Sequence, residues 1–257
     1  MIKKQRGVTL IELLVSMVLA VSLAAGLSQL FVQSQTSFKL QRNLSDMTDD
    51  ASFILEELAK GVNQAGAPGN DTTFRDVADN SVLSSGISLA EDEYIHGTDN
   101  EFIYRFKLSS STELDTFVCN ATLKTSAVIG NTITVRIYTA LDSSDPKIPV
   151  FYCKVKGTTS GTQAAEPLIS EVEKLEIRYV VRSGTSSPYT FYTTTASNVV
   201  DWKQVIAIKV YVVLRSVDDK LTKNKATYKI EDSETTATDN RLYKVFSKTI
   251  KLRSTDH

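Results

Sequence analysis

The chain has 257 residues, of which 42% are hydrophobic and 23% are charged, so it can bury a full core and is not a disordered tail. Its formal net charge is −1, and without the three basic residues Lys3, Lys4 and Arg6 the remainder carries −4. A mildly acidic body gives no general electrostatic case for binding DNA or RNA.

A basic start followed by an apolar run forms the first predicted element. Residues 8–27 are apolar or small except for hydroxyl side chains and one carboxylate, Glu12. This order is typical of a signal or membrane anchor whose amino end stays in the cytoplasm. A charge at the centre of a membrane helix costs about 2.5 to 3.5 kcal/mol on insertion scales, so Glu12 needs a specific role.

Three interpretations of this segment compete. An ordinary signal peptide would be cut near residues 20–25, and a plain anchor would be kept whole, but both leave Glu12 unexplained. In the third, the chain is cut between Gly7 and Val8, which makes Glu12 the fifth residue of the mature protein.

The stretch KKQRGVTLIELLVSMVLA resembles the class III signal of type IV pilins and type II secretion pseudopilins, although the family usually has phenylalanine where Val8 stands. The resemblance implies that a prepilin peptidase cuts between Gly7 and Val8, that the Val8 amine is N-methylated, and that Glu12 pairs with the Val8 amine of a neighbouring subunit. Such a partner would offset the cost of burying the carboxylate and fix the axial register between helices.

Beyond residue 27 the helical pattern continues and becomes amphipathic. Apolar residues recur at three- or four-residue steps and predict one buried face: Leu40, Leu44, Met47, Ala51, Leu55, Leu58 and Val62. The helix should end near Gln64, because Gly66, Pro68 and Gly69 follow. We therefore predict a leader at residues 1–7, a transmembrane and assembly helix at 8–66, and a globular β-rich domain at 67–257.

Strand patterns dominate the rest of the chain. Alternating apolar residues predict strands at residues 101–108, 132–139, 172–181 and 205–215, and a closing or edge strand at 243–253. Their frequency favours antiparallel pairing, so the expected fold class is α+β and pilin-like: a long N-terminal helix packed against an antiparallel sheet. The aromatic stretch SSPYTFYTTT fits either a surface contact patch or half-buried strand residues.

The body resembles, more narrowly, the PilW-type minor pilins and the related minor pseudopilin J of type II secretion. The resemblance rests on ASFILEELAKGVNQAG, on Trp202 followed by a long strand that ends in Leu-Arg-Ser at residues 214–216, and on Phe246 followed by Leu-Arg at residues 252–253.

Few residues suggest other chemistry. In an exported body, Cys119 and Cys153 would form one disulfide that closes a loop of about 35 residues; two free buried thiols are the alternative. His96, in the acidic run AEDEYIHGTDNE, and the terminal His257 are expected to be solvated. No catalytic or nucleotide-binding motif and no metal-ligand spacing is present, so we expect no enzyme activity, cofactor or metal.

The expected function is that of a minor pilin in initiation of a type IV pilus and in its tip complex, supporting twitching motility, adhesion or DNA uptake. Expected partners are other minor pilins and the major pilin through the N-terminal helix, prepilin peptidase, and a tip adhesin. The precursor would cross the inner membrane once with a cytoplasmic N-terminus and later reach the pilus on the surface of a Gram-negative bacterium. A type II secretion pseudopilin and a membrane-anchored periplasmic ligand-binding protein are the alternatives.

Overall fold

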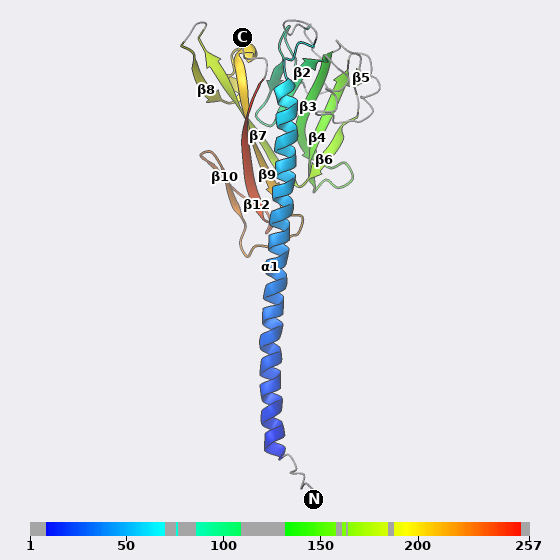
Figure 1. Cartoon of the computed structure of the whole chain (residues 1–257), viewed down its shortest axis with the longest axis vertical. Helices are drawn as coiled ribbons and strands as arrows, with labels where there is room; N and C mark the ends of the chain where they lie inside the picture. Colours follow the sequence, from blue (N-terminus) through cyan, green and yellow to red (C-terminus); the bar gives the residue numbers. More distant parts are fainter. Residues whose placement is uncertain are drawn as a thin grey trace, which may run out of the picture. The chain divides into compact units, whose positions relative to one another are not determined.

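The structure is a computed structural model that describes residues 9–69, 76, 86–108, 132–157, 161–162, 164–184 and 188–252. Internal packing divides the chain into two units, residues 1–45 and residues 46–257. The boundary falls within one α-helix, α1, which runs from Leu10 to Gln64 (Figure 1). The second unit is called the body below.

The last turns of α1 belong to the core of the body. A stripe of buried side chains repeats every three or four residues: Met47, Ala51, Ile54, Leu58, Val62 and Ala65. Met47, Ala51, Leu58 and Val62 were predicted from the sequence, whereas the predicted Leu40 and Leu44 are only half-buried. Ile54 rather than Leu55 lies in this stripe, and Leu55 is only half-buried. The expected face was therefore wrong by one residue at that turn.

The helix ends where predicted, and hydrogen bonds join its end to the sheet. Gly66 adopts a φ of +75°, the left-handed conformation that commonly closes a helix and that glycine adopts at little cost. Its N–H donates to the Arg105 carbonyl at 2.9 Å, and the Lys107 N–H donates to the Ala67 carbonyl at 2.9 Å. Pro68 then forms a bridge with Lys107. The chain therefore leaves α1 already paired to a strand.

One antiparallel sheet follows the order β1-β2-β3-β4-β5, with β6 also paired to β4. Its strands are β1 (Ile95–Gly97), β2 (Glu101–Lys107), β3 (Thr132–Leu141), β4 (Pro149–Gly157), β5 (Gly161–Thr162) and β6 (Glu166–Ser170). On β2, Phe102, Tyr104 and Phe106 face the main core. Ile103 points to the opposite face and packs with Ile87 and Leu89.

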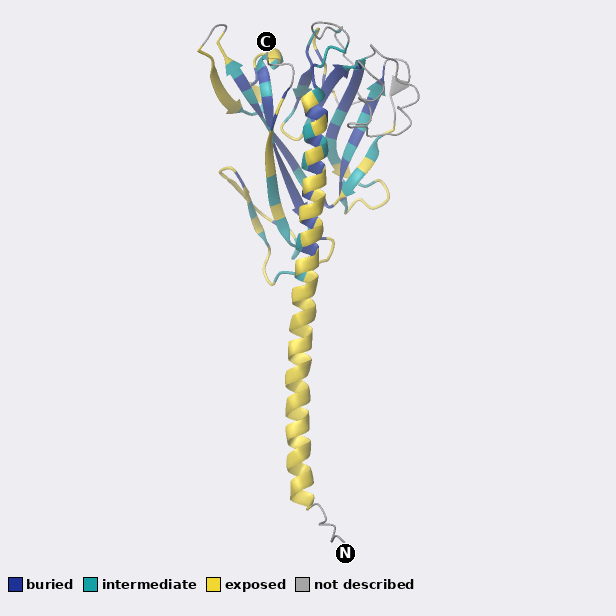
Figure 2. Ribbon diagram, viewed as in Figure 1, coloured by how far each residue is buried: buried dark blue, intermediate teal, exposed yellow. Residues whose placement is uncertain are grey.

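A second antiparallel sheet has the order β12-β9-β7-β8. Its strands are β7 (Val172–Ser183), β8 (Thr190–Thr194), β9 (Val205–Arg215) and β12 (Tyr243–Lys251), and two short 3-10 helices, η3 (Ala196–Asn198) and η4 (Trp202–Gln204), connect β8 to β9. β12 lies at one edge of the sheet, as predicted. The two sheets and residues 46–65 share one core (Figures 1 and 2).

The central strand β9 is buried on both faces. Ile208, Val210, Val212 and Leu214 lie in the main core, as the alternation predicts. Ile206 does not: the pairing with β7 shifts register between Val180 and Val181, so Val205 is buried in its place. The opposite face is covered by the hairpin of β10 (Thr227–Ile230) and β11 (Ser233–Thr236), through a cluster of Tyr211, Val213 and Ile230.

Candidate functional site

The first part of α1 exposes a long apolar surface (Figure 2). Large hydrophobic side chains at residues 10–32 are each more than half exposed, between 52% at Leu14 and 79% at Leu10. Covering a side chain of this size is worth roughly 1.5 to 3 kcal/mol, so this segment needs apolar surroundings. With a mean hydropathy of 2.3 in its most apolar window, α1 is long and apolar enough to cross a membrane.

Hydroxyl side chains in this segment are satisfied within the helix. Ser16 donates to the Leu13 carbonyl at 2.9 Å, and Ser22 and Ser28 donate to carbonyls one turn earlier at 2.9 and 2.8 Å. Such bonds remove the need for water around the hydroxyl groups. The segment is therefore compatible with a lipid or helix-packed environment despite its serines.

Glu12 lies in the first turn of α1 and is exposed. It is the only ionisable residue between Thr9 and Phe38. Its N–H donates to the Thr9 carbonyl at 3.1 Å and makes a longer 3.4 Å contact to the Thr9 hydroxyl. Thr9-Leu10-Ile11-Glu12 therefore has the pattern of a capping box, in which a threonine and a glutamate three residues later cap the helix start.

The contact between the Glu12 N–H and the Thr9 hydroxyl was missed by the sequence reasoning, although the T-x-x-E spacing was there to be read. A glutamate at this position can complete a capping box, which gives Glu12 a second, local reason to occur beside the predicted contact with another subunit. Gly7 and Val8, where cleavage and methylation are predicted, lie outside the described residues.

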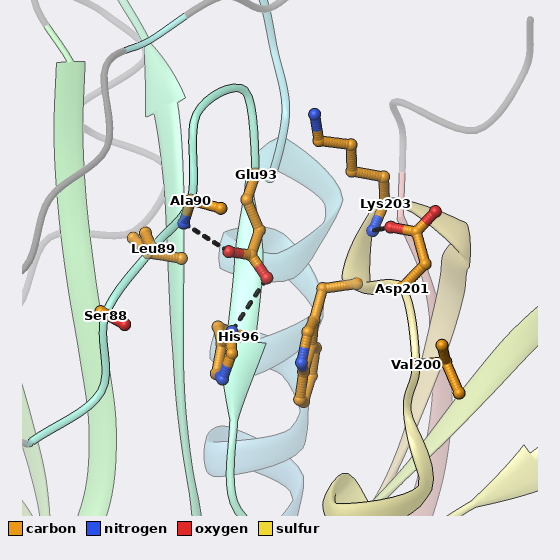
Figure 3. A pocket seen from close by; sticks show the side chains of 9 residues that line it. Ser88, Leu89, Ala90, Glu93, His96, Val200, Asp201 and Lys203 are labelled. Carbon is orange, nitrogen blue, oxygen red and sulfur yellow. Dashed lines mark hydrogen bonds and ion pairs between the residues drawn. The ribbon is translucent and has the colours of Figure 1, made fainter.

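A pocket of about 390 Å³ on the body brings together residues from the β1 region and from η4 (Figure 3). His96 of β1 lies inside it, with its ring stacked on Trp202 at a centroid distance of 4.2 Å. Its Nδ1 lies 2.8 Å from Oε1 of Glu93, whose side chain is 5% exposed. The expectation that His96 is solvated in a loop was wrong, because this stack and the buried carboxylate hold it at the joint between the two sheets.

A buried arginine supports the loop before β1. Arg105 is 1% exposed; its Nε donates to the Glu93 carbonyl, and one terminal nitrogen donates to the Ala90 carbonyl at 2.7 Å. Its other terminal nitrogen lies 3.2 Å from the Asp76 carboxylate, which pairs the buried charge. Glu93 also accepts a 2.6 Å hydrogen bond from the Ala90 N–H. These contacts fix the carboxylate that faces His96.

Ser88 lines the same pocket, and within the described part of the chain no hydrogen bond joins its hydroxyl to His96. Among the described residues, no group of three or more His, Cys, Asp or Glu side chains is placed to hold a metal ion. The visible role of His96 and Trp202 is to join the two sheets.

The structure describes one of the two cysteines. Cys153 is fully buried on β4, where it pairs with Ile137 of β3. Cys119 lies outside the described residues. The disulfide between them therefore stays a prediction.

The fold and the exposed apolar helix together define a pilin-like subunit: a long N-terminal helix, apolar in its first part, whose second part packs against antiparallel sheets. Comparison with known families gives two matches. The family described as Type IV Pilus-assembly protein W, PilW, matches residues 120–254, and the Prokaryotic N-terminal methylation motif matches residues 2–28. The chain belongs to the PilW family of type IV pilus assembly proteins.

Searches of curated proteins and of solved structures gave no significant match. Membership of the PilW family makes this a structural protein rather than an enzyme, as the sequence indicates. The methylation motif, together with the apolar helix, implies processing by a prepilin peptidase, residence in the inner membrane and later assembly with other pilins.

Proposed function

We propose that this protein is a low-copy minor pilin that helps to initiate a type IV pilus and stays in its tip complex. The precursor crosses the inner membrane once with its N-terminus in the cytoplasm, is cut between Gly7 and Val8, and is methylated on Val8. The observation that carries the proposal is Glu12, the one ionisable residue in an exposed apolar segment that also matches the methylation motif.

Glu12 acts as the register device of assembly. Once the helix leaves the membrane and packs among other pilin helices, its carboxylate needs a charged partner, and the Val8 amine of a neighbouring subunit supplies one. An ion pair in apolar surroundings is strong only when the geometry is good, so it favours one axial offset between helices. A wrong offset leaves two buried charges without partners.

The size of the globular domain favours a low copy number. Residues 67–257 amount to 191 residues outside the helix, a large volume for a subunit that repeats along a thin fibre. At a tip or in an initiation complex, only a few copies have to fit. Neighbours there are other minor pilins, the major pilin and a tip adhesin.

The decisive experiment separates the charge of Glu12 from its capping role. Glu12→Gln keeps a side chain that can complete the capping box but removes the charge, whereas Thr9→Ala removes the cap and keeps the charge. We expect Glu12→Gln to reduce the number of surface pili at least tenfold while Thr9→Ala has a small effect. Mass spectrometry of the parent should find a methylated Val8 as its first residue.

Several results would contradict the proposal. A mature chain that begins after residue 20, or that keeps Met1, would exclude the prepilin route. Full piliation with Glu12→Gln would remove the register role. Loss of protein secretion, with pili intact, in a strain lacking this chain would place it in a type II secretion system instead.

A further inference from the structure

β8 differs from the other edge strands of the body in having no visible protection against strand pairing. It pairs on one side with β7, from Tyr179 opposite Thr194 to Ser183 opposite Thr190, and no described strand pairs with its other side. An open edge exposes backbone N–H and C=O groups that readily accept another strand, so folded proteins normally block such edges with charges, prolines or very short strands.

The remaining described edges are blocked in these ways, including β10 and β11 of the two-stranded sheet, which are four residues long and carry Lys229 and Glu234. At the opposite edge of the same sheet, β12 exposes three lysines, Lys244, Lys248 and Lys251. In the other sheet, β1 has three residues, β5 has two, and β6 contains Glu166 and Pro167. β8 has five residues of sequence TFYTT, and no charged residue occurs from residue 184 to residue 200.

The residues of β8 are mostly exposed (Figure 2). Phe191 is 58% exposed and Tyr192, which points to the other face of the sheet, is 44% exposed. Tyr189 and Val200, close in sequence, are 40% and 94% exposed. Of SSPYTFYTTT, Thr190–Thr194 form the strand β8, on which Phe191 and Tyr192 are exposed, and the Tyr189 ring just before it lies 4.8 Å from the guanidinium of Arg182. This exposure favours the interpretation of the segment as a surface contact patch.

The open edge and the composition of β8 indicate the kind of segment that could bind there. An unpaired strand edge recognises an extended peptide backbone, and aromatic and β-branched side chains favour cross-strand neighbours of the same kind. β8 itself carries no charge, and the nearby Arg182 of β7, opposite Phe191, is stacked on the Tyr189 ring. The edge therefore matches an uncharged incoming strand, in contrast to the lysines of β12, which oppose pairing with another basic edge. We propose that the open edge of β8 receives an extended, uncharged strand from a different pilin subunit, which continues the four-stranded sheet across the subunit boundary.

This inference rests on the proposed function, because a subunit of a mixed tip complex meets other pilins rather than copies of itself. It also gives the helix and the body different roles in assembly. The N-terminal helix with Glu12 would give an axial register common to all subunits, whereas the β8 edge would select the neighbour of the body.

The first test is photo-cross-linking of the full chain in the cells that assemble the pilus. Phe191→p-benzoylphenylalanine places the probe on β8, and Val217→p-benzoylphenylalanine is the matched control, since Val217 is 68% exposed but lies in the bend after β9. We expect the Phe191 probe to give at least ten times more product than the control, joined to a different protein that carries an N-terminal methylation motif. A product with a second copy, a product with lipid, equal yields, or no product would overturn the inference.

The second test adds a charge to the edge. Thr193→Lys makes β8 resemble β12, and Thr249→Lys adds a lysine to β12 as the control; both threonines are exposed. We expect Thr193→Lys to lower the cross-link yield and the number of pili at least fivefold, while Thr249→Lys and the melting temperature of both variants stay near the parent values. Normal assembly by Thr193→Lys would refute the role of β8; if Glu12→Gln still failed to assemble, the proposed function would stand.

Discussion

Gly97, at the end of β1, is a residue at which a single added methyl group should strongly destabilise the body. A Cβ there would overlap the hydroxyl oxygen of Tyr179 and would lie 2.5 Å from the Glu101 carbonyl oxygen and 2.9 Å from Cα of Phe102. Two of these three atoms belong to the backbone around β2, so rotation of the Tyr179 side chain cannot relieve the clash.

The cost of Gly97→Ala follows from these contacts. Overpacking a filled site costs about 1 to 3 kcal/mol. Displacement of Tyr179 would also remove its 2.8 Å hydrogen bond to the Thr98 carbonyl, which is worth about 1 kcal/mol. We expect the free energy of unfolding to fall by about 2 to 4 kcal/mol, which lowers the melting temperature of a body of this size by roughly 4 to 16 °C.

The assay is thermal unfolding of the full chain in detergent micelles, followed by the fluorescence of Trp202. This is the only tryptophan in the chain, and its ring meets that of Tyr179 edge-on at a centroid distance of 4.7 Å. Gly26→Ala is the matched control, because a Cβ at Gly26, in the first unit, meets nothing within 4 Å. It should leave the Trp202 transition unchanged.

A double-mutant cycle tests whether the clash with Tyr179 causes the loss of stability in Gly97→Ala. Tyr179→Phe removes the nearest obstacle, so Gly97→Ala should cost less in that background, with a coupling of about 0.5 to 3 kcal/mol. Strictly additive effects would mean that the Tyr179 hydroxyl is not the obstacle. An unchanged melting temperature for Gly97→Ala would refute the packing argument as a whole.

Three further predictions concern the body. Leu58→Ala should lower the free energy of unfolding by about 2 to 5 kcal/mol in urea titrations, because Leu58 is 1% exposed in the helix stripe. The control Phe53→Ala, at a site 50% exposed, should lower it by under about 1 kcal/mol. Equal losses of stability would exclude the stripe as the face of α1 that packs on the sheets. Burial raises the pKa of Tyr179 well above its ordinary value of 10.0, and Asp99 and Glu101 raise it further. Its contribution to stability is therefore complete below pH 10 and is lost as the pH rises from there toward the folded pKa; Tyr179→Phe should make this alkaline decline of the melting temperature shallower, and an unchanged decline would contradict the assignment to Tyr179. If Cys119 and Cys153 are bonded, the unfolded but unreduced chain should resist thiol alkylation, and reduction should remove roughly 3 to 4 kcal/mol of stability; rapid labelling without reductant would exclude the bond.

The helix and the long strands could be predicted because each obeys a simple period. The three- and four-residue steps predict the buried stripe from Met47 onward, and alternation predicts the core faces of β2, β3 and β7. Errors occur where pairing changes the period. The register shift opposite Val180 replaces Ile206 with Val205 in the core, which no local pattern in the sequence reveals.

The features missed from sequence depend on distant partners. His96 and Trp202 are more than a hundred residues apart, and only the meeting of the two sheets stacks them. Similarly, the acidic run around Glu93 looks solvated until Arg105 binds its carbonyl and the neighbouring Ala90. The exposure of β8 is also a property of the sheet order, since the same aromatic strand would be buried at its centre.

The division of α1 at Ser45 indicates where a protease could cut the chain and leave the core of the body intact. A protease that severed the chain just ahead of Asp46 would shed a water-soluble fragment that keeps Met47, Ala51, Ile54 and Leu58, and with them its sealed interior. Cleavage after Val62 would instead expose the apolar faces of the sheets that the helix had covered, and the remaining fragment would aggregate. Trimming experiments that seek a crystallisable fragment should therefore begin no later than Asp46, since Asn43 just ahead of it is also buried, and never within the stripe.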